Sequence, residues 1–310
     1  MNDPARHGAG MPLLPYRTEK IFSAEHCGKR VFMKFTKMHG LGNDFILPDP
    51  SEYLTEEELP KAARALCDRR LGVGADGLLL VCPSREADIR MRIINADGSE
   101  AEMCGNGIRC FAKYVYDHSI VPREEMTIQT LAGIMKPTLS IREGQVVAVR
   151  VDMGYPRFAA QEIPVRAEDP QHFFIPLDEG GVEAASVLMG VPHTMVFTHD
   201  LSEQNVVRLG AQIERHTLFP QKTNVNFVRV EDEKTLSIRT FERGAGLTLA
   251  CGTGSCASAV AAYKKGLCGS RITVKNAVGE LLIEIAADDK VYMSGPAKTV
   301  FCGQTDLGGF

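Results

Sequence analysis

The stretch Asn95-Ala-Asp-Gly-Ser-Glu-Ala-Glu-Met-Cys104-Gly-Asn-Gly-Ile-Arg-Cys110 returns in altered form as Glu242-Arg-Gly-Ala-Gly-Leu-Thr-Leu-Ala-Cys251-Gly-Thr-Gly-Ser-Cys256. Both copies place a polar residue nine positions before a cysteine, then the pattern Cys-Gly-x-Gly, then a largely apolar run. An apolar run with helical spacing directly after such a loop is typical of a helix that begins at the loop. We therefore predict that Cys104 and Cys251 each lie at the start of a helix.

A helix start favours an anion, because its first backbone N–H groups have no partner within the helix. A cysteine at that place is expected to ionise more easily than free cysteine, whose pKa is ~8.5, and its thiolate can act as a base or a nucleophile. The glycines of both loops leave the backbone bare, so a small carboxylate can approach the same N–H groups. Two such loops in one chain indicate reactive thiols beside an anion site.

The composition describes a globular protein. The chain has 310 residues, 44% hydrophobic content and a net charge of -4, which is long enough for two domains and not basic enough to indicate nucleic-acid binding. No apolar run approaches the ~18 residues of a membrane span, so no membrane partner is expected. The nine cysteines form an odd set without a secretory signal, which predicts reduced thiols in a cytoplasmic protein. No Cys-x-x-Cys pair occurs, and we predict no metal site.

The first residues differ from the rest of the chain. Residues 1–32 contain prolines, charges of both signs and no hydrophobic periodicity, and we predict a disordered N-terminal extension. The folded protein is expected to begin at Met33.

The remaining chain reads as one plan used twice. Periodicity and turn residues predict helices over 55–70, from Gly107, over 203–216 and from Ser255. Strands are predicted over 78–81, 89–94, 126–130, 134–139, 145–153, 185–188, 195–198, 225–230, 235–241, 272–275 and 281–286. In both halves the order is a strand, the cysteine loop, a helix and then a hairpin. We therefore predict a duplicated α+β domain.

Five motifs make the chain similar to the diaminopimelate epimerase family. They are Met38-His-Gly-Leu-Gly-Asn-Asp-Phe45, Asn95-Ala-Asp-Gly-Ser99, Met103-Cys-Gly-Asn-Gly-Ile-Arg109, Thr223-Asn-Val-Asn-Phe227 and Glu242 to Gly254. The resemblance runs from Met33 to the C-terminus. It implies two pseudo-symmetric α+β domains, each a rolled mixed β-sheet around a central helix, with the active site in the cleft between them. It divides the chain into 33–148 plus 297–310, and 149–296.

The resemblance also implies an activity. The family are isomerases that convert LL-2,6-diaminopimelate to meso-diaminopimelate in lysine and peptidoglycan precursor biosynthesis, in the cytoplasm, without a cofactor and typically as homodimers. The residues indicate the same chemistry, because inversion of a stereocentre without redox needs two acid/base groups on opposite faces of the carbon. Cys104 and Cys251 are the predicted catalytic pair, with one thiolate and one thiol, since like charges in proximity resist joint ionisation.

The remaining site residues are implied by the resemblance. Arg243 is well shaped for a bidentate contact with a distal carboxylate, and His193 and Glu242 are expected to support the thiols. The backbone N–H groups of the two loops are expected to stabilise the charge that accumulates on the substrate carboxylate. The predicted substrate-binding residues are Asn43, Asn95, Gly105, Asn106, Asn224, Glu242, Arg243, Gly252 and Thr253. A purely structural role for these residues is an alternative, since asparagines are common in turns and Glu242-Arg243 is equally consistent with a surface ion pair.

Two other functions stay open at this stage. A racemase of another amino acid, such as histidine, would keep both cysteines and change the residues that read the side chain. A redox thiol protein would use the cysteines for disulfide exchange. One departure bears on the substrate: the family often has Gly-Asn-Pro-His where this chain has Gly190-Val-Pro-His193. Valine offers no hydrogen bond, but a charge-assisted contact from Arg243 outweighs one neutral hydrogen bond, so we predict that diaminopimelate is the substrate.

Overall fold

The computed structural model describes residues 32–51, 54–178 and 180–306. The predicted N-terminal extension therefore lies, apart from Phe32, outside the described residues. Phe32 is the first residue of strand β1, one position before the predicted start of the fold.

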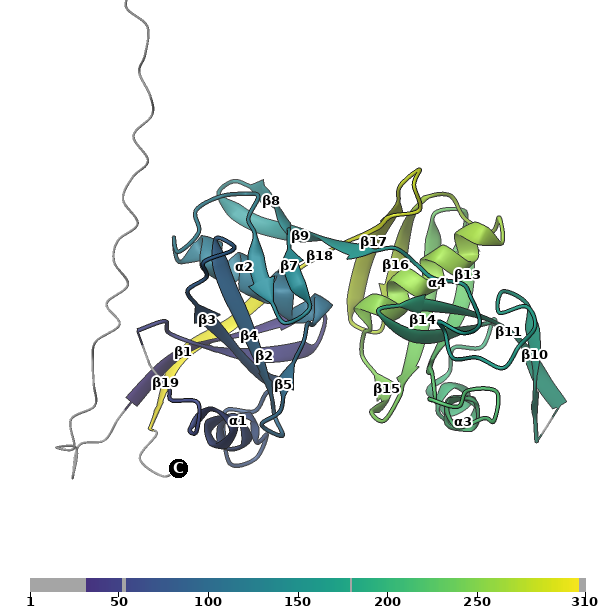
Figure 1. Cartoon of the computed structure of the whole chain (residues 1–310), viewed down its shortest axis with the longest axis horizontal. Helices are drawn as coiled ribbons and strands as arrows, with labels where there is room; N and C mark the ends of the chain where they lie inside the picture. The colour runs from purple at the N-terminus through teal and green to yellow at the C-terminus, as the bar shows by residue number, and fades with distance from the viewer. Residues whose placement is uncertain (1–31, 52–53, 179, 307–310) are drawn as a thin grey trace, which may run out of the picture.

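Nineteen strands and four helices are formed by the described residues (Figure 1). In chain order they are β1 Phe32–Gly40, β2 Asn43–Pro48, α1 Leu59–Cys67, β3 Gly77–Cys82, β4 Ile89–Asn95, β5 Glu100–Ala101, α2 Gly105–Asp117, β6 Ile128–Thr130, β7 Gly133–Met135, β8 Thr138–Arg142, β9 Gln145–Gly154, β10 Phe173–Leu177, β11 Gly180–Met189, β12 Val191–Phe197, α3 Glu203–Glu214, β13 Asn224–Asp232, β14 Thr235–Glu242, β15 Gly246–Thr248, α4 Gly252–Lys264, β16 Arg271–Asn276, β17 Gly279–Ile285, β18 Val291–Gly295 and β19 Lys298–Asp306.

Two mixed sheets organise these elements. The first has the order β19-β1-β2-β3-β4-β6-β7, and the second has the order β10-β11-β12-β13-β14-β16-β17-β18-β9-β8. Both contain the same series: a parallel pair joined through a helix, an antiparallel pair, a short strand folded back before the cysteine loop, and a second parallel pair. The series is β2-α1-β3-β4-β5-α2-β6 in the first half and β12-α3-β13-β14-β15-α4-β16 in the second. The predicted duplicated α+β architecture is confirmed.

Helices α2 and α4 form the centres of the two main cores. In α2 the predicted apolar face, Ile108, Phe111, Ala112 and Val115, is fully buried and packs with residues from β2, β4 and β9. Helix α4 is buried nearly all round because it is built of small residues such as Ala257. Each central helix therefore lies inside a curved sheet, as Figure 1 shows, and its first turn is held rigidly.

Several predicted boundaries were wrong for local reasons. The predicted Thr55–Glu58 contact is present, since the Thr55 N–H donates to the Glu58 carboxylate at 2.8 Å, but it lies in a turn before the helix, which begins at Leu59 rather than residue 55. The helix ends at Cys67 rather than residue 70, because the Asp68 carboxylate accepts the N–H groups of Arg70 and Leu71 in a turn. The predicted strand 134–139 is divided between β7 and β8 around Pro137, which has no N–H to donate.

Strands β9, β18 and β19 connect the two halves. Strand β9 pairs with β18 in the second sheet, yet its residues Val149 and Val151 pack in the core around α2. After β18, the chain continues into β19, which pairs with β1 in the first sheet. Within the described residues, no helix has the length and apolar character needed to cross a bilayer.

The core of the first half allows a stability prediction. Phe111→Ala removes a fully buried aromatic side chain from α2, so we expect the free energy of unfolding to fall by about 3–5 kcal/mol in urea titrations. Phe174→Ala is the control, because Phe174 is 54% exposed and its truncation should change the unfolding free energy by less than about 0.5 kcal/mol. Equal losses in the two variants would show that α2 does not centre the core.

Candidate functional site

Both cysteines cap the helices that follow them. The Cys104 Sγ accepts a hydrogen bond from the Gly107 N–H at 3.4 Å, and the Cys251 Sγ accepts one from the Gly254 N–H at 3.4 Å. Both residues have extended backbone angles and are the N-caps of α2 and α4. The prediction that each thiol lies at a helix start is confirmed. Helix α2 begins two residues earlier than predicted, and α4 begins three residues earlier.

The two helix starts approach each other across Met293 of β18. A Cβ atom placed on Gly105 would lie 3.2 Å from the Met293 Cε, and one placed on Gly252 would lie 3.1 Å from the Met293 Sδ. The same position on Gly252 lies 4.0 Å from the Asn106 Oδ1. The thiols also interact electrostatically, since negative charge on Cys104 raises the pKa of Cys251. The structure thus brings Cys104, Gly105 and Asn106 together with Cys251 and Gly252.

Asn43 contacts the first thiol. Its Oδ1 accepts hydrogen bonds from the Cys104 Sγ and the Asn106 Nδ2, both at 3.4 Å, while its Nδ2 donates to the Asp76 carboxylate at 2.6 Å. Arg69 in turn forms an ion pair with Asp76 at 2.8 Å. Asp76 therefore orients the Asn43 amide so that its oxygen faces the thiol. The contact was not predicted, because no sequence signal connects Asp76 to Asn43.

Asn95 lies on the same edge of the first sheet. It ends β4 and pairs with Gly77, the residue after Asp76. Its Nδ2 donates to the Ser99 Oγ at 3.0 Å, so the side chain is held within the turn that follows β4.

Glu242 and Thr253 surround the second thiol. The Thr253 Oγ1 lies 3.5 Å from the Cys251 Sγ, and the Thr248 hydroxyl donates to the Glu242 carboxylate at 2.7 Å. Burial raises the pKa of Glu242, against the lowering effect of hydrogen bonds from Thr248 and the Cys251 thiol. The Glu242 carboxylate is thus a hydrogen-bond acceptor next to Cys251.

His193 is fully buried and uncharged. Burial, with a contribution from Arg243, lowers its pKa to about 3. The Asn226 Oδ1 accepts from Thr240 at 2.9 Å, which turns the Asn226 Nδ2 toward the His193 Nδ1 at 3.1 Å. The proton of the neutral ring is then on Nε2, which has no hydrogen-bond partner among the described residues. Asn226, which sequence reasoning missed, shares a strand face with Asn224.

The loop from Glu242 to Gly246 carries the predicted distal contact. The Asn224 Oδ1 accepts the Arg243 N–H at 2.8 Å, and the Arg243 Nη1 donates to the Gln221 carbonyl at 2.9 Å. The buried Glu214 carboxylate of α3 accepts the Gly244 N–H at 3.0 Å. The Arg243 side chain is exposed, but its backbone is anchored on both sides, by Asn224 and by Glu214.

Comparisons with known proteins agree with this geometry. The family model for diaminopimelate epimerase matches residues 35–159 and 185–300, which include both cysteine loops. The chain belongs to the diaminopimelate epimerase family. The resemblance predicted from the motifs is confirmed, and the family are isomerases.

Individual relatives are similar over most of their length. The diaminopimelate epimerase of Caldanaerobacter subterraneus subsp. tengcongensis is 50% identical over 277 residues, which covers 89% of this chain and 100% of the relative. The diaminopimelate epimerase of Methanococcus maripaludis is 46% identical over 283 residues, with coverage of 89% and 100%. The chain therefore spans the whole length of both relatives.

Solved structures share the fold at low identity. A probable proline racemase from Agrobacterium radiobacter K84 has a TM-score of 0.64 at 18% identity, covering 90% of this chain and 94% of that one. A phenazine biosynthesis protein of the PhzF family from Bacillus anthracis has a TM-score of 0.65 at 16% identity, covering 89% and 100%. The fold is thus that of the diaminopimelate epimerase and PhzF type.

The expectation that Cys104 and Cys251 ionise more easily than free cysteine was wrong. In this structure the helix start does not make either thiol more acidic than free cysteine, because burial raises the pKa of Cys104 and raises that of Cys251 to about 12. Backbone hydrogen bonds from the first helical turn lower both values but do not outweigh the burial. Ionisation therefore depends on the other charges around each thiol.

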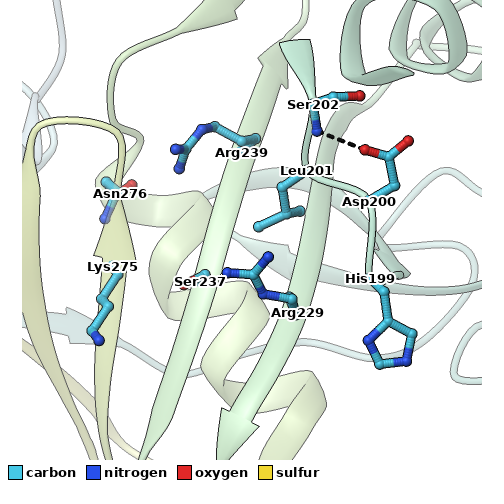
Figure 2. A pocket seen from close by; sticks show the side chains of 9 residues that line it. All are labelled: His199, Asp200, Leu201, Ser202, Arg229, Ser237, Arg239, Lys275 and Asn276. Carbon is cyan, nitrogen blue, oxygen red and sulfur yellow. Dashed lines mark hydrogen bonds between the residues drawn. The ribbon is translucent and has the colours of Figure 1, made fainter. Parts of the chain in front are cut away.

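A separate surface pocket lies on the second half. Its volume is about 510 Å³. Figure 2 shows the side chains that line it, from the β12–α3 loop and strands β13, β14 and β16. It is lined by His199, Asp200, Leu201, Ser202, Arg229, Ser237, Arg239, Lys275 and Asn276. None of the predicted site residues lines it, so the pocket is distinct from the thiol pair.

Gly254 permits a test of the cap geometry. A Cβ atom at this position would lie 2.4 Å from the Asn226 Oδ1 and 3.2 Å from the Cys251 Sγ. Gly254→Ala should therefore displace both groups and lower kcat/KM by about 100-fold. Gly269→Ala is the matched control, since its nearest new contact is 3.9 Å away. Unchanged turnover of diaminopimelate by Gly254→Ala would contradict the fit described here.

Proposed function

We propose that this chain inverts one stereocentre of LL-2,6-diaminopimelate to give the meso form, with Cys104 and Cys251 as the acid/base pair. The observation that carries the proposal is the approach of two thiol-capped helix starts across Met293, in a member of the diaminopimelate epimerase family. The substrate α-carbon would lie between the thiols. One thiolate removes the α-proton from one face, and the other thiol delivers a proton to the opposite face.

The helix starts would stabilise the carbanion. The first-turn N–H groups of Gly105, Asn106, Gly252 and Thr253 have no acceptors within their helices. We assign these groups to the carboxylate next to the reacting carbon, where negative charge accumulates when the proton leaves. The two helices contribute to the same charge because their starts converge. Glu242 would support Cys251, whose thiol donates to its carboxylate, and neutral His193 is assigned to support the thiol pair.

The distal end of the substrate would be bound by the outer residues. Arg243 is assigned to the distal carboxylate, and Asn43, Asn95 and Asn224 complete the binding site. Val191 begins β12 as a partly buried residue opposite Met189, and its side chain offers no hydrogen bond to the distal group. The proposal therefore places the distal recognition mainly on the exposed Arg243 guanidinium.

The assembly and domain boundaries are also proposals. We propose that the protein is a cytoplasmic homodimer and that the reaction needs no cofactor, as the family resemblance implies. The division into 33–148 plus 297–310 and 149–296 is supported by the pairing of β19 with β1, which returns the C-terminal strand to the first sheet.

The two-base proposal is tested by removing one thiol at a time. Cys104→Ala and Cys251→Ala should each abolish epimerisation, because each face of the α-carbon depends on its own acid/base group. The assay follows conversion of LL-diaminopimelate in deuterated water, where the wild-type product gains deuterium at the inverted carbon. Cys302→Ala, an exposed thiol on β19, should retain full activity. Inversion by either single variant at more than a small percentage of the wild-type rate would refute the assignment.

The same exchange assay separates the alternative functions. A redox thiol protein would exchange no α-proton with solvent, whereas a histidine racemase would exchange that of histidine in preference to diaminopimelate.

Substrate choice is expected to depend on Arg243. LL-diaminopimelate should be turned over far better than L-histidine, L-lysine or L-glutamate, because a charge-assisted bidentate contact selects the distal carboxylate. Arg243→Met should erase this preference in kcat/KM, while Arg142→Met on β8 should leave it unchanged. A higher kcat/KM for histidine than for diaminopimelate in the wild-type protein would overturn the substrate assignment and leave the two-thiol mechanism in place.

A further inference from the structure

Arg109 is a buried cation next to the first thiol. It lies in α2, five residues after Cys104, and its side chain is completely buried. Its guanidinium donates to the Gly105 carbonyl at 2.8 Å, the Asn106 Oδ1 at 2.8 Å and the Pro296 carbonyl at 3.3 Å. All three acceptors are neutral. The hydrogen bonds are therefore satisfied, but they bring no negative charge to balance the guanidinium, which is costly in a buried position.

The groups that could balance the charge of Arg109 are cysteines. Across residues 32–51, 54–178 and 180–306, no carboxylate forms an ion pair with it, and the groups whose ionisation would favour its protonated form are Cys110, Cys104 and Cys256. Cys110 and Cys256 are fully buried in the two cores, and burial raises the pKa of both thiols. Cys104 is partly exposed at the helix start. It is the thiol of the three that has both access to solvent and the backbone N–H groups that favour an anion.

The guanidinium is held in one place. A Cβ atom on Gly40 would lie 3.1 Å from the Arg109 Nη2, and one on Gly295 would lie 3.2 Å from its Nε. The backbone of β1 and the backbone at the end of β18 therefore pack directly against the Arg109 side chain. This packing holds the charge of Arg109 beside the start of α2.

The second thiol has the opposite surroundings. Glu242 of β14 faces Cys251, and its negative charge raises the pKa of that thiol, as does the charge of Cys104 when ionised. Glu242 also raises the pKa of Cys104, but there Arg109 and the N–H groups of Asn106 and Gly107 oppose it. The charges around the pair therefore differ, although the two backbones are alike.

We propose that Arg109 is a positioning residue that fixes the first turn of α2 and supplies the positive charge balancing a Cys104 thiolate, so that Cys104 ionises in preference to Cys251. This inference rests on the proposed two-thiol function and deepens it. Arg109 acts through Asn106, Gly105 and Cys104 and does not contact the substrate.

The test measures the ionisation of each thiol separately. Wild-type protein, Arg109→Gln and Arg109→Lys are treated with iodoacetamide from pH 6 to 10.5, and the alkylation rates of Cys104 and of Cys251 at each pH are followed by peptide mass spectrometry. Cys251 should stay below its midpoint throughout this range, because its pKa is raised to about 12. Arg109→Gln keeps hydrogen-bond donors but loses the charge, so the Cys104 midpoint should rise by about one pH unit, as expected for loss of an adjacent opposite charge. Arg109→Lys should keep the midpoint near the wild-type value. Arg239→Met, which removes an arginine on β14 outside the site, should leave the alkylation rates of both thiols unchanged at each pH.

The pH dependence of turnover distinguishes an electrostatic role of Arg109 from a merely structural one. At pH 7.5, Arg109→Gln should lose about ten-fold in kcat/KM, which follows the ionisation of the free enzyme, and the loss should shrink as the pH rises toward the new Cys104 midpoint, since one pH unit is a ten-fold change in thiolate. A loss that stays constant with pH, or a Cys104 midpoint unchanged in Arg109→Gln, would overturn the proposal.

The wild-type protein provides a measurement that needs no variant to fold. Its Cys104 should be alkylated at lower pH than Cys251, and the reverse order would refute the preferred ionisation of Cys104. Failure of the proposed function is distinguishable, because wild-type protein that does not epimerise diaminopimelate would leave the alkylation rates as an independent result.

Discussion

The hydrogen bond from a helical N–H to a cysteine sulfur is the constraint on which both halves of the molecule depend. It requires an extended backbone at the cysteine and close approach of the third residue beyond it, at 3.4 Å in both copies. A side chain at Gly254 would occupy the place of the Asn226 amide and crowd the Cys251 sulfur. The Cys-Gly-x-Gly pattern is thus a packing requirement, and it leaves the first-turn N–H groups accessible for an anion.

Position at a helix start does not by itself decide which thiol ionises. Burial opposes the helix in both copies and raises both pKa values. The difference between the copies comes from side chains that the duplication did not preserve. Glu242 lies beside Cys251, where the first half has neutral Asn95 at the equivalent position of the repeat, and Arg109 lies behind Cys104, where the second half has Cys256 at the equivalent position. One backbone plan therefore supports two thiols of unequal acidity, which is what a base and an acid require.

Local pattern predicted much of the fold. The face of α2, the Thr55–Glu58 contact and the strands that lead into each cysteine loop follow from periodicity and turn chemistry. Strands β18 and β19 were missed as strands, since β19 is mostly exposed and shows no alternation. Of the site, the thiol-capped helix starts were predictable. Asp76, Glu214 and Arg109 were not, because their roles arise from contacts through space, and arginine is rarely fully buried. The pKa expectation failed because burial cannot be read from a loop motif.

The segment from β18 to β19 explains how two similar halves hold their thiols in one relative position. Met293 of β18 packs against both helix starts, and the Pro296 carbonyl accepts a hydrogen bond from the Arg109 side chain of α2. The next strand, β19, pairs with β1 in the first sheet, while β18 pairs with β9 in the second sheet. Inversion at carbon needs an acid and a base on opposite faces at a fixed separation, and a movement of about 1 Å between them is costly to the rate. A continuous segment that is hydrogen bonded to both sheets and packed against both helix starts opposes such a movement more strongly than side-chain contact between the halves alone.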